Sequence, residues 1–235
     1  MATAEAGIPD DFPRCHPALK EAIFIGMLGG PGSGKGTQCQ MISQRFDLAH
    51  ISIGDVLRQI NRPGSQHADV IRENMIAGRV GPKELTIAIL REHILRSVAH
   101  GTRAFILDGF PRNKEQCDYF EQSISSIALL IVLDCPEFTM IERLTLSDRN
   151  RFDDNQDNIR RHIETFQKTT YEVIDSFRSR NKVHSINSNQ EPDAVGLQLG
   201  AILDGLVSKR TGAYLNICGF ASMMILGLHS EQLRG

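Results

Sequence analysis

The sequence predicts an α/β fold in which five short parallel strands alternate with helices. Apolar runs of four to eight residues, bounded by glycine or polar residues, are typical of strands buried on both faces of a sheet. Segments of helical character separate these runs, and such alternation produces a parallel sheet with right-handed crossovers. A glycine-rich loop lies between the first strand and the first helix. These observations favour three layers, with helices on both faces of a five-stranded sheet.

The predicted elements follow one another in a regular order. The strands are Ala22–Leu28, Ala49–Ile53, Ala104–Leu107, Ile127–Asp134 and Val183–Ile186. The helices are 35–46, 55–60, 67–77, 83–99, 137–146, 156–180 and 193–207. We expect 156–180 to be one long amphipathic helix, because its apolar residues recur at roughly helical spacing.

The composition is that of an ordinary globular protein. The chain has 235 residues, of which 41% are hydrophobic and 23% are charged, and its formal net charge is −2. This length suits one large domain or a domain with inserted lobes, and the charge gives no reason to expect nucleic acid or an anionic membrane as a partner. The five cysteines include no CxxC pair, and we interpret them as reduced thiols of a cytoplasmic protein.

Both ends of the chain differ from its centre. Residues 1–20 contain no apolar signal segment, and we expect them to be a flexible leader. The tail 209–235 includes the apolar segment 213–228, which is shorter than the roughly 20 residues that a bilayer span needs. A docked or disordered tail, or a segment from a misassigned exon, is favoured over a membrane-associating tail.

The stretch GGPGSGKGTQC, residues 29–39, is typical of a phosphate-binding loop. Its glycines allow backbone N–H groups to face an anion, and the start of the next helix adds partial positive charge. Lys35 would reach the β- and γ-phosphates of a nucleotide. The alternative is a glycine-rich turn without a ligand, which the strand–loop–helix context disfavours. The loop does not specify the reaction, because such loops serve ATPases, GTPases and small-molecule kinases.

Charged residues beyond the loop indicate phosphoryl transfer. Asp108 follows a buried strand at the sheet edge where ligands bind, and its carboxylate could hold the water shell of Mg²⁺. A helix-capping or turn role is the alternative for Asp108. Arg112 follows a Gly and a Pro that turn the chain toward the cleft. Arg149 and Arg151 lie in a polar stretch that is either a closing lid or a solvated loop.

Four segments resemble, in order, the signature of the adenylate kinase and UMP/CMP kinase family: GGPGSGKGTQC, HISIGDVLR, FILDGFPRNKEQ and RFDDNQDNI. The resemblance covers about residues 21–208. It implies a P-loop NTPase fold with a helical insert for the nucleoside monophosphate, about 52–82, and a short lid without zinc, about 145–156. It also implies ATP and a nucleoside monophosphate as substrates, Mg²⁺ as cofactor and a monomeric state.

The resemblance assigns a role to each residue that matches the family pattern. The implied ATP-binding residues are Gly32, Ser33, Gly34, Lys35, Gly36, Thr37 and Arg143, the last stacking on adenine. The implied acceptor-binding residues are Ile53, Arg58, Arg79, Val80, Gly81, Gly109, Phe110, Pro111, Arg112, Gln116, Arg151 and His162. Catalysis is assigned to Lys35, Asp108, Arg112, Arg149 and Arg151, with Mg²⁺ held through water near Asp108 and Thr37.

Departures from the family pattern leave the acceptor open. Ile53 replaces a hydroxyl or small residue, Gly81 an apolar one, and His162 a phosphate-binding arginine. Gln116 is the adenylate-type residue and favours AMP, whereas the FPRN and LDC segments resemble the pyrimidine kinases and favour UMP or CMP. His162 and the shortened lid also allow a nucleotide-binding regulator with weak catalysis, although the other phosphate-binding residues are retained.

Overall fold

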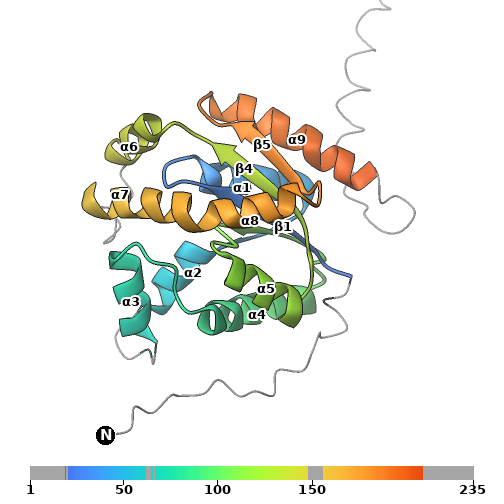
Figure 1. Ribbon diagram of the computed structural model, residues 1–235. Helices are drawn as coiled ribbons and strands as arrows, with labels where there is room; N and C mark the ends of the chain where they lie inside the picture. The colour runs from blue at the N-terminus through green and yellow to red at the C-terminus, as the bar shows by residue number, and fades with distance from the viewer. Residues whose placement is uncertain (1–18, 20, 62–64, 66, 148–155, 209–235) are drawn as a thin grey trace, which may run out of the picture.

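The structure, a computed structural model, describes residues 19, 21–61, 65, 67–147 and 156–208. The predicted tail lies outside these residues, and so does the predicted leader except for Leu19. The segment 148–155, which contains both predicted lid arginines, Arg149 and Arg151, also lies outside them. The described residues form a central sheet with helices on both faces (Figure 1).

Five parallel strands form the sheet, in the order β2-β3-β1-β4-β5. Their bounds are β1 Ile23–Gly29, β2 Ala49–Ser52, β3 Ala104–Asp108, β4 Ile127–Asp134 and β5 Val183–Asn187. Each predicted strand is confirmed, with boundaries within one residue of those predicted. Because β1 pairs with β3 on one side and β4 on the other, the glycine-rich loop leaves the middle of the sheet.

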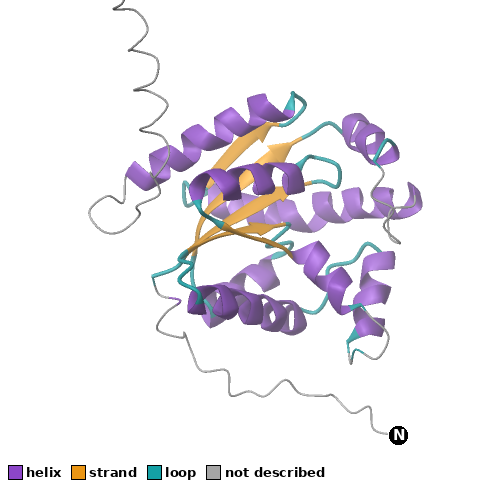
Figure 2. Ribbon diagram, turned by 180° about the vertical axis from the view of Figure 1, so that it is seen from behind, coloured by secondary structure: helices purple, strands orange, loops and turns teal. Residues whose placement is uncertain are grey.

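Helices cover the two faces of the sheet in separate layers. The described α-helices are α1 Lys35–Phe46, α2 Ile53–Ile60, α3 Ala68–Ile76, α4 Lys83–Ala99, α5 Lys114–Ser123, α6 Glu137–Thr145, α7 Gln156–Thr165, α8 Tyr171–Arg178 and α9 Pro192–Ser208. α1 and α9 pack on one face, and α4, α5 and α8 on the other (Figures 1 and 2). Among the described residues, no helix is both long and apolar enough to cross a membrane.

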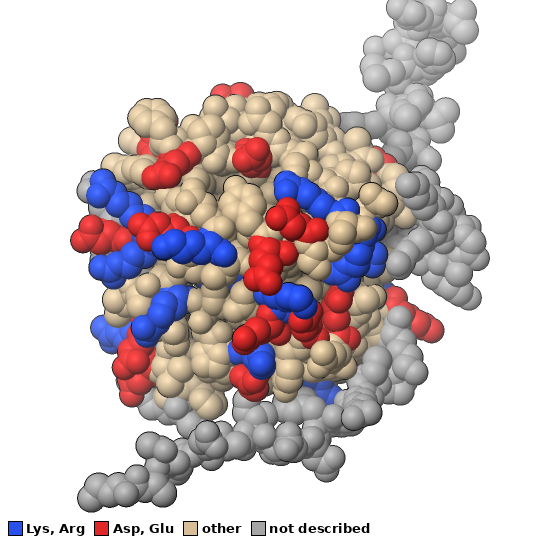
Figure 3. Space-filling view, in the orientation of Figure 1, with Lys and Arg blue, Asp and Glu red and all other residues tan. Residues whose placement is uncertain are grey.

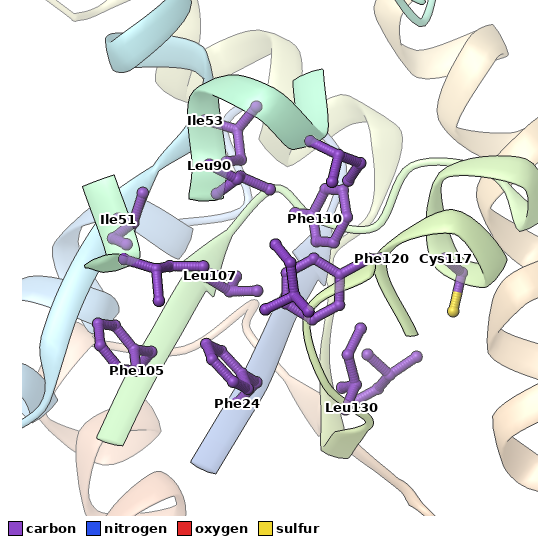
Figure 4. Close-up of a cluster of buried hydrophobic side chains, with 14 of the residues drawn as sticks. Phe24, Ile51, Ile53, Leu90, Phe105, Leu107, Phe110, Cys117, Phe120 and Leu130 are labelled. Carbon is purple, nitrogen blue, oxygen red and sulfur yellow. The ribbon is translucent and has the colours of Figure 1, made fainter. Parts of the chain in front are cut away.

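An aromatic cluster anchors the layer that holds α4, α5 and α8 (Figure 4). Phe24 of β1 stacks on Phe105 of β3, with ring centroids 5.2 Å apart. Phe120 of α5 meets Phe24 edge-on at 5.3 Å and packs against Phe110 at 5.2 Å. Phe110 is fully buried and lies two residues after the end of β3. The cluster therefore fixes the loop that leads from Asp108 toward α5.

The helix α5 is an element that the sequence reasoning missed. Its sequence, KEQCDYFEQS, contains few apolar letters, yet Cys117 and Phe120 are buried on one face. Asn113 caps the helix, because its side chain accepts a 2.8 Å hydrogen bond from the backbone N–H of Gln116. An N-cap residue followed three positions later by Glu or Gln is a recognisable helix start, and this signal was present in the sequence.

The expectation of one continuous helix over 156–180 is wrong in its middle. α7 and α8 lie in line, but a π-helical segment, Phe166–Thr170, separates them (Figure 1). A π-helical turn shifts the side chains that follow it around the helix axis, and such turns are frequent at functional sites. The other predicted helices are confirmed, with ends within two residues of those predicted.

Candidate active site

A cleft of about 890 Å³ opens where the strands of the sheet end. Residues of the glycine-rich loop, of β3 and its following loop, and of α2, α6 and α7 line it. Its volume lies in the range of small-molecule sites. Among the described residues, four Lys and Arg side chains line it, namely Lys35, Arg58, Arg112 and Arg143. On the outer face shown in Figure 3, by contrast, basic and acidic side chains are interspersed.

The glycine-rich loop has the backbone geometry of a phosphate-binding loop. Gly32 and Gly34 have φ angles of 79° and 91°, a region that favours glycine. A Cβ atom at Gly32 would also lie only 2.5 Å from the carbonyl oxygen of Met140 in α6. The Lys35 ammonium donates 2.8 Å hydrogen bonds to the carbonyl oxygens of Gly29 and Gly30. Lys35 thus lies across the loop, where it can exchange these carbonyls for phosphate oxygens.

Asp108 is the buried carboxylate of the cleft. It is 7% exposed, and its Oδ2 lies 3.4 Å from Nε2 of His50 in β2. Burial acts to raise the pKa of Asp108, but the His50 hydrogen bond and the charges of Lys35 and Arg112 outweigh it, so the pKa is lowered. Asp108 is therefore ionised at neutral pH. Thr37 also lines the cleft, so oxygen donors of the kind that Mg²⁺ prefers are present in it.

Two arginines, Arg58 and Arg112, also line the cleft. Arg58 in α2 forms a 3.0 Å ion pair with Asp55, three residues earlier in the same helix. Nε of Arg112 donates to the carbonyl oxygen of Gly109 at 3.2 Å. Because both guanidinium groups line the same cleft as Lys35, the arrangement can hold two phosphate-bearing groups facing each other.

Arg112 is fixed by hydroxyl groups that the sequence reasoning did not identify. The hydroxyl of Thr170, in the π-helical segment, donates a 3.0 Å hydrogen bond to its carbonyl oxygen. The hydroxyl of Thr169 lies 3.0 Å from the same oxygen and shares its one hydrogen with the carbonyl oxygen of Thr165, at 2.8 Å. The backbone N–H of Arg112 donates to Oε1 of Gln116 at 3.3 Å. The backbone of Arg112 is therefore held on both sides, and the π-helical turn supplies half of this support.

Some predicted acceptor-binding residues line the cleft and others do not. Of the sequence-predicted residues, those on the cleft wall are Gly32, Ser33, Gly34, Lys35, Gly36, Thr37, Arg58, Val80, Asp108, Gly109, Arg112, Arg143 and His162. Of the predicted acceptor residues that the structure describes, those that do not line the cleft are Ile53, Arg79, Gly81, Phe110, Pro111 and Gln116, and Arg151 lies outside the described residues. Val80 and Gly81 line a smaller neighbouring cavity of about 380 Å³.

Gln116 is a buried link between three elements. It is 2% exposed, and its Nε2 donates 3.4 Å hydrogen bonds to the Gly81 carbonyl oxygen and to Oγ1 of Thr86 in α4. Gln116, which belongs to α5, is thus hydrogen-bonded to Thr86 of α4, to Gly81 and to the backbone of Arg112. The family resemblance implies a contact of Gln116 with the acceptor base, whereas in this structure its amide is hydrogen-bonded to protein groups.

His162 contacts the end of α3. Its Nε2 lies 3.1 Å from the carbonyl oxygen of Met75, in the last turn of that helix. The neighbouring Arg161 donates to the carbonyl oxygen of Ile76 at 3.5 Å. His162 thus lines the cleft while it connects α7 to α3.

The fold and this site define an enzyme of the nucleoside monophosphate kinase class. The family model described as adenylate kinase matches residues 27–182, and the chain belongs to this family. A uridylate kinase of Schizosaccharomyces pombe is 38% identical over 75% of this chain and 94% of that enzyme. Adenylate kinase isoenzyme 1 of Rattus norvegicus is 36% identical over 80% of this chain and 97% of its own. A UMP-CMP kinase of Prunus armeniaca is 35% identical over 79% of this chain and 77% of that enzyme.

Proposed function

We propose that this nucleoside monophosphate kinase transfers the γ-phosphoryl group of ATP reversibly to AMP in preference to other acceptors, with Mg²⁺ as cofactor. The basis for AMP is Gln116, four residues after Arg112, which matches the adenylate-type glutamine of the family. Its amide carries both a donor and an acceptor, and it would exchange its hydrogen bonds to Gly81 and Thr86 for the acceptor base. The hydrogen bonds of Gln116 to the Arg112 backbone and to Gly81 keep it beside the acceptor side of the cleft.

Charge and position account for the catalysis. The acceptor phosphate already carries an anionic oxygen near neutral pH, so the reaction needs no general base. Arg58 and Arg112 would hold the acceptor, and Lys35 would hold the transferred group in line with it. Arg149 and Arg151, which lie outside the described residues, would close over both substrates and exclude water.

The residues present fit Mg²⁺. The ionised carboxylate of Asp108 would hold its water shell, with Thr37 on the same wall of the cleft. The chemistry that bound Mg²⁺ supplies is neutralisation of charge on the phosphate oxygens as the phosphoryl group moves. Asp108 keeps that role at neutral pH because its pKa is lowered.

A second candidate acceptor is UMP or CMP. It is favoured by the 38% identity to an enzyme named uridylate kinase, which is slightly higher than the 36% identity to adenylate kinase isoenzyme 1. A third candidate, from another class, is a regulator that binds nucleotide and turns over slowly. The observation that motivates it is His162, which stands where the family resemblance places an arginine.

One assay separates these candidates. The purified chain receives MgATP with AMP, UMP, CMP or GMP, and formation of the diphosphate is followed. We expect kcat/KM for AMP to exceed that for the pyrimidines by about tenfold or more. Turnover of pyrimidines alone would exclude AMP, and ATP binding without turnover would support the regulator. Lys35→Met, which keeps the length of the side chain but removes its charge, should lower kcat by about 10² or more.

A matched pair of variants tests the role of Gln116. Gln116→Asn should shift the ratio of kcat/KM from AMP toward UMP and CMP. Gln38→Asn makes the same truncation at another buried glutamine, which donates to the Pro192 carbonyl oxygen, and should leave that ratio unchanged. Equal ratios in the two variants would remove Gln116 as the basis of the AMP assignment.

A further inference from the structure

We propose that Cys39, His50 and Asp108 form a binding site for a thiophilic divalent cation, of which Zn²⁺ is the type, beside the phosphate-binding loop. The three side chains come from α1, β2 and the end of β3. One sulfur, one imidazole nitrogen and one carboxylate oxygen lie within 4.8 Å of one another. Among the described residues, no other group of three His, Cys, Asp or Glu side chains converges in this way.

The donor set matches zinc and not magnesium. Zn²⁺ takes thiolate, imidazole and carboxylate ligands, and three protein ligands leave a fourth position for water. Mg²⁺ takes oxygen ligands in an octahedral arrangement and has no use for a thiol. The same Asp108 can therefore serve two cations of different chemistry, through water to Mg²⁺ and directly to Zn²⁺.

The geometry requires only small side-chain movements. At zinc bond lengths of 2.0–2.3 Å, tetrahedral ligands lie roughly 3.3–3.7 Å apart. Nε2 of His50 and Oδ2 of Asp108 are already 3.4 Å apart. The side chain of His50 is 24% exposed at the cleft wall, so it can turn toward the fully buried Cys39. The three ligand atoms are at most 4.8 Å apart, so they would have to approach one another by about 1 Å to reach these distances.

Charge balance also suits a divalent cation. Zinc binding converts the Cys39 thiol to a thiolate and releases one proton to solvent, while a metal–sulfur bond forms. The thiolate and the Asp108 carboxylate then neutralise the two charges of the ion. Lys35 and Arg112 act on Asp108 from the cleft, so the cation competes with them for this carboxylate. We therefore expect reversible binding rather than a permanently held structural metal.

The consequence for activity rests on the proposed function, whereas metal binding does not. A zinc ion bound to Asp108 would occupy its carboxylate, which could then no longer hold the water shell of Mg²⁺. Zn²⁺ should then inhibit phosphoryl transfer, and a chelator should restore it.

Co²⁺, a coloured substitute for Zn²⁺, tests the site in the full-length chain. Thiolate ligation gives a charge-transfer absorption that Zn²⁺ should abolish by displacement. Cys39→Ser should lose this absorption, whereas Cys135→Ser, at a half-buried thiol outside the cluster, should keep it. Equal absorption in the wild type and Cys39→Ser, or none in the wild type, would overturn the proposal.

A second variant keeps the test decisive if Cys39→Ser does not fold. His50→Gln should weaken Co²⁺ binding at least tenfold, and unchanged binding would overturn the proposal. In the kinase assay at fixed Mg²⁺, Cys39→Ser should resist a Zn²⁺ concentration that halves wild-type activity. If no acceptor is turned over, the proposed function is wrong, but the Co²⁺ absorption experiment still tests whether the metal site exists.

Discussion

The imidazole of His162 lies 3.1 Å from the carbonyl oxygen of Met75 and thereby joins α7 to the last turn of α3. Carbonyl groups at a helix end have no partner within the helix, and they favour donors and positive charge. Arg161 meets the next carbonyl, that of Ile76, from the same helix. The end of α3 is thus held against α7 by these two contacts, and His162 itself lines the cleft.

Replacement of His162 by arginine should strengthen acceptor binding. An arginine can still donate to the Met75 carbonyl, and it adds a fixed charge on the cleft wall, where charge-assisted bonds to phosphate are stronger than neutral ones. We expect KM for the nucleoside monophosphate to fall by about three- to tenfold, with KM for ATP unchanged. His162→Gln, which donates without charge, is the control. A KM that rises in His162→Arg would show that α7 has adapted to the histidine.

Gly78→Ala should weaken the contact between the end of α3 and α7. Gly78 has a φ of 65°, and an added Cβ would lie 2.9 Å from both Cδ2 of His162 and Cβ of Arg161. Gly101 is a suitable control, because its φ is 96° but nothing lies within 4 Å of an added Cβ. Both variants should lose about 1 kcal/mol or more of unfolding free energy through backbone strain, measured in urea. Only Gly78→Ala should also raise KM for the acceptor, and equal KM values would contradict the role of this contact.

Loss of the hydroxyls beneath Arg112 should impair catalysis more than stability. Thr169→Val and Thr170→Val each remove one hydroxyl that lies 3.0 Å from the Arg112 carbonyl oxygen, at a cost of about 1 kcal/mol of unfolding free energy. The double variant should lower kcat/KM for the acceptor by more than the product of the single effects, since the second hydroxyl no longer compensates. Thr139→Val, whose hydroxyl donates to Asn189 on the surface, should leave kcat/KM unchanged.

Acid should remove the stability that Asp108 supplies. Its pKa is lowered in the folded state relative to the ordinary value of about 3.9, so its contribution is complete above that value and disappears as the pH falls through the folded-state pKa. The free energy of unfolding of the wild type should therefore exceed that of Asp108→Asn at neutral pH, and this difference should disappear below about pH 4. Urea unfolding of both proteins between pH 7 and pH 3 measures the difference. A difference that stays constant across this range would show that Asp108 is not stabilised as a carboxylate.

The elements that the sequence predicted well are those with strong local signals. Each strand is an apolar run with polar or glycine borders, so its ends were placed within one residue. The helix α5 was missed because only one side of it is apolar and its neighbours are charged. The π-helical turn was missed because it spans only five residues, which is too short a stretch for hydrophobic spacing to reveal one extra residue.

The residues of the site also divide into those with a local sequence signal and those that only the fold brings together. The glycine-rich loop, Asp108 and Arg112 were found because each has its own sequence context. His50 was missed because only the pairing of β2 with β3 brings it to Asp108, with Ser52 opposite Asp108 in register. Thr169 and Thr170 were missed because the π-helical turn decides which way their hydroxyls point.

The central place of β1 in the sheet has a consequence for the order of folding during synthesis. The strand and its loop leave the ribosome early, but the partners of β1 are Ala104–Asp108 and Ile127–Asp134. Until both have emerged, β1 lacks the neighbours that bury its two edges, and pairings over such long chain separations form slowly. Nascent chains that end before Asp134 should therefore be unable to bind ATP, although every residue of the loop is already present.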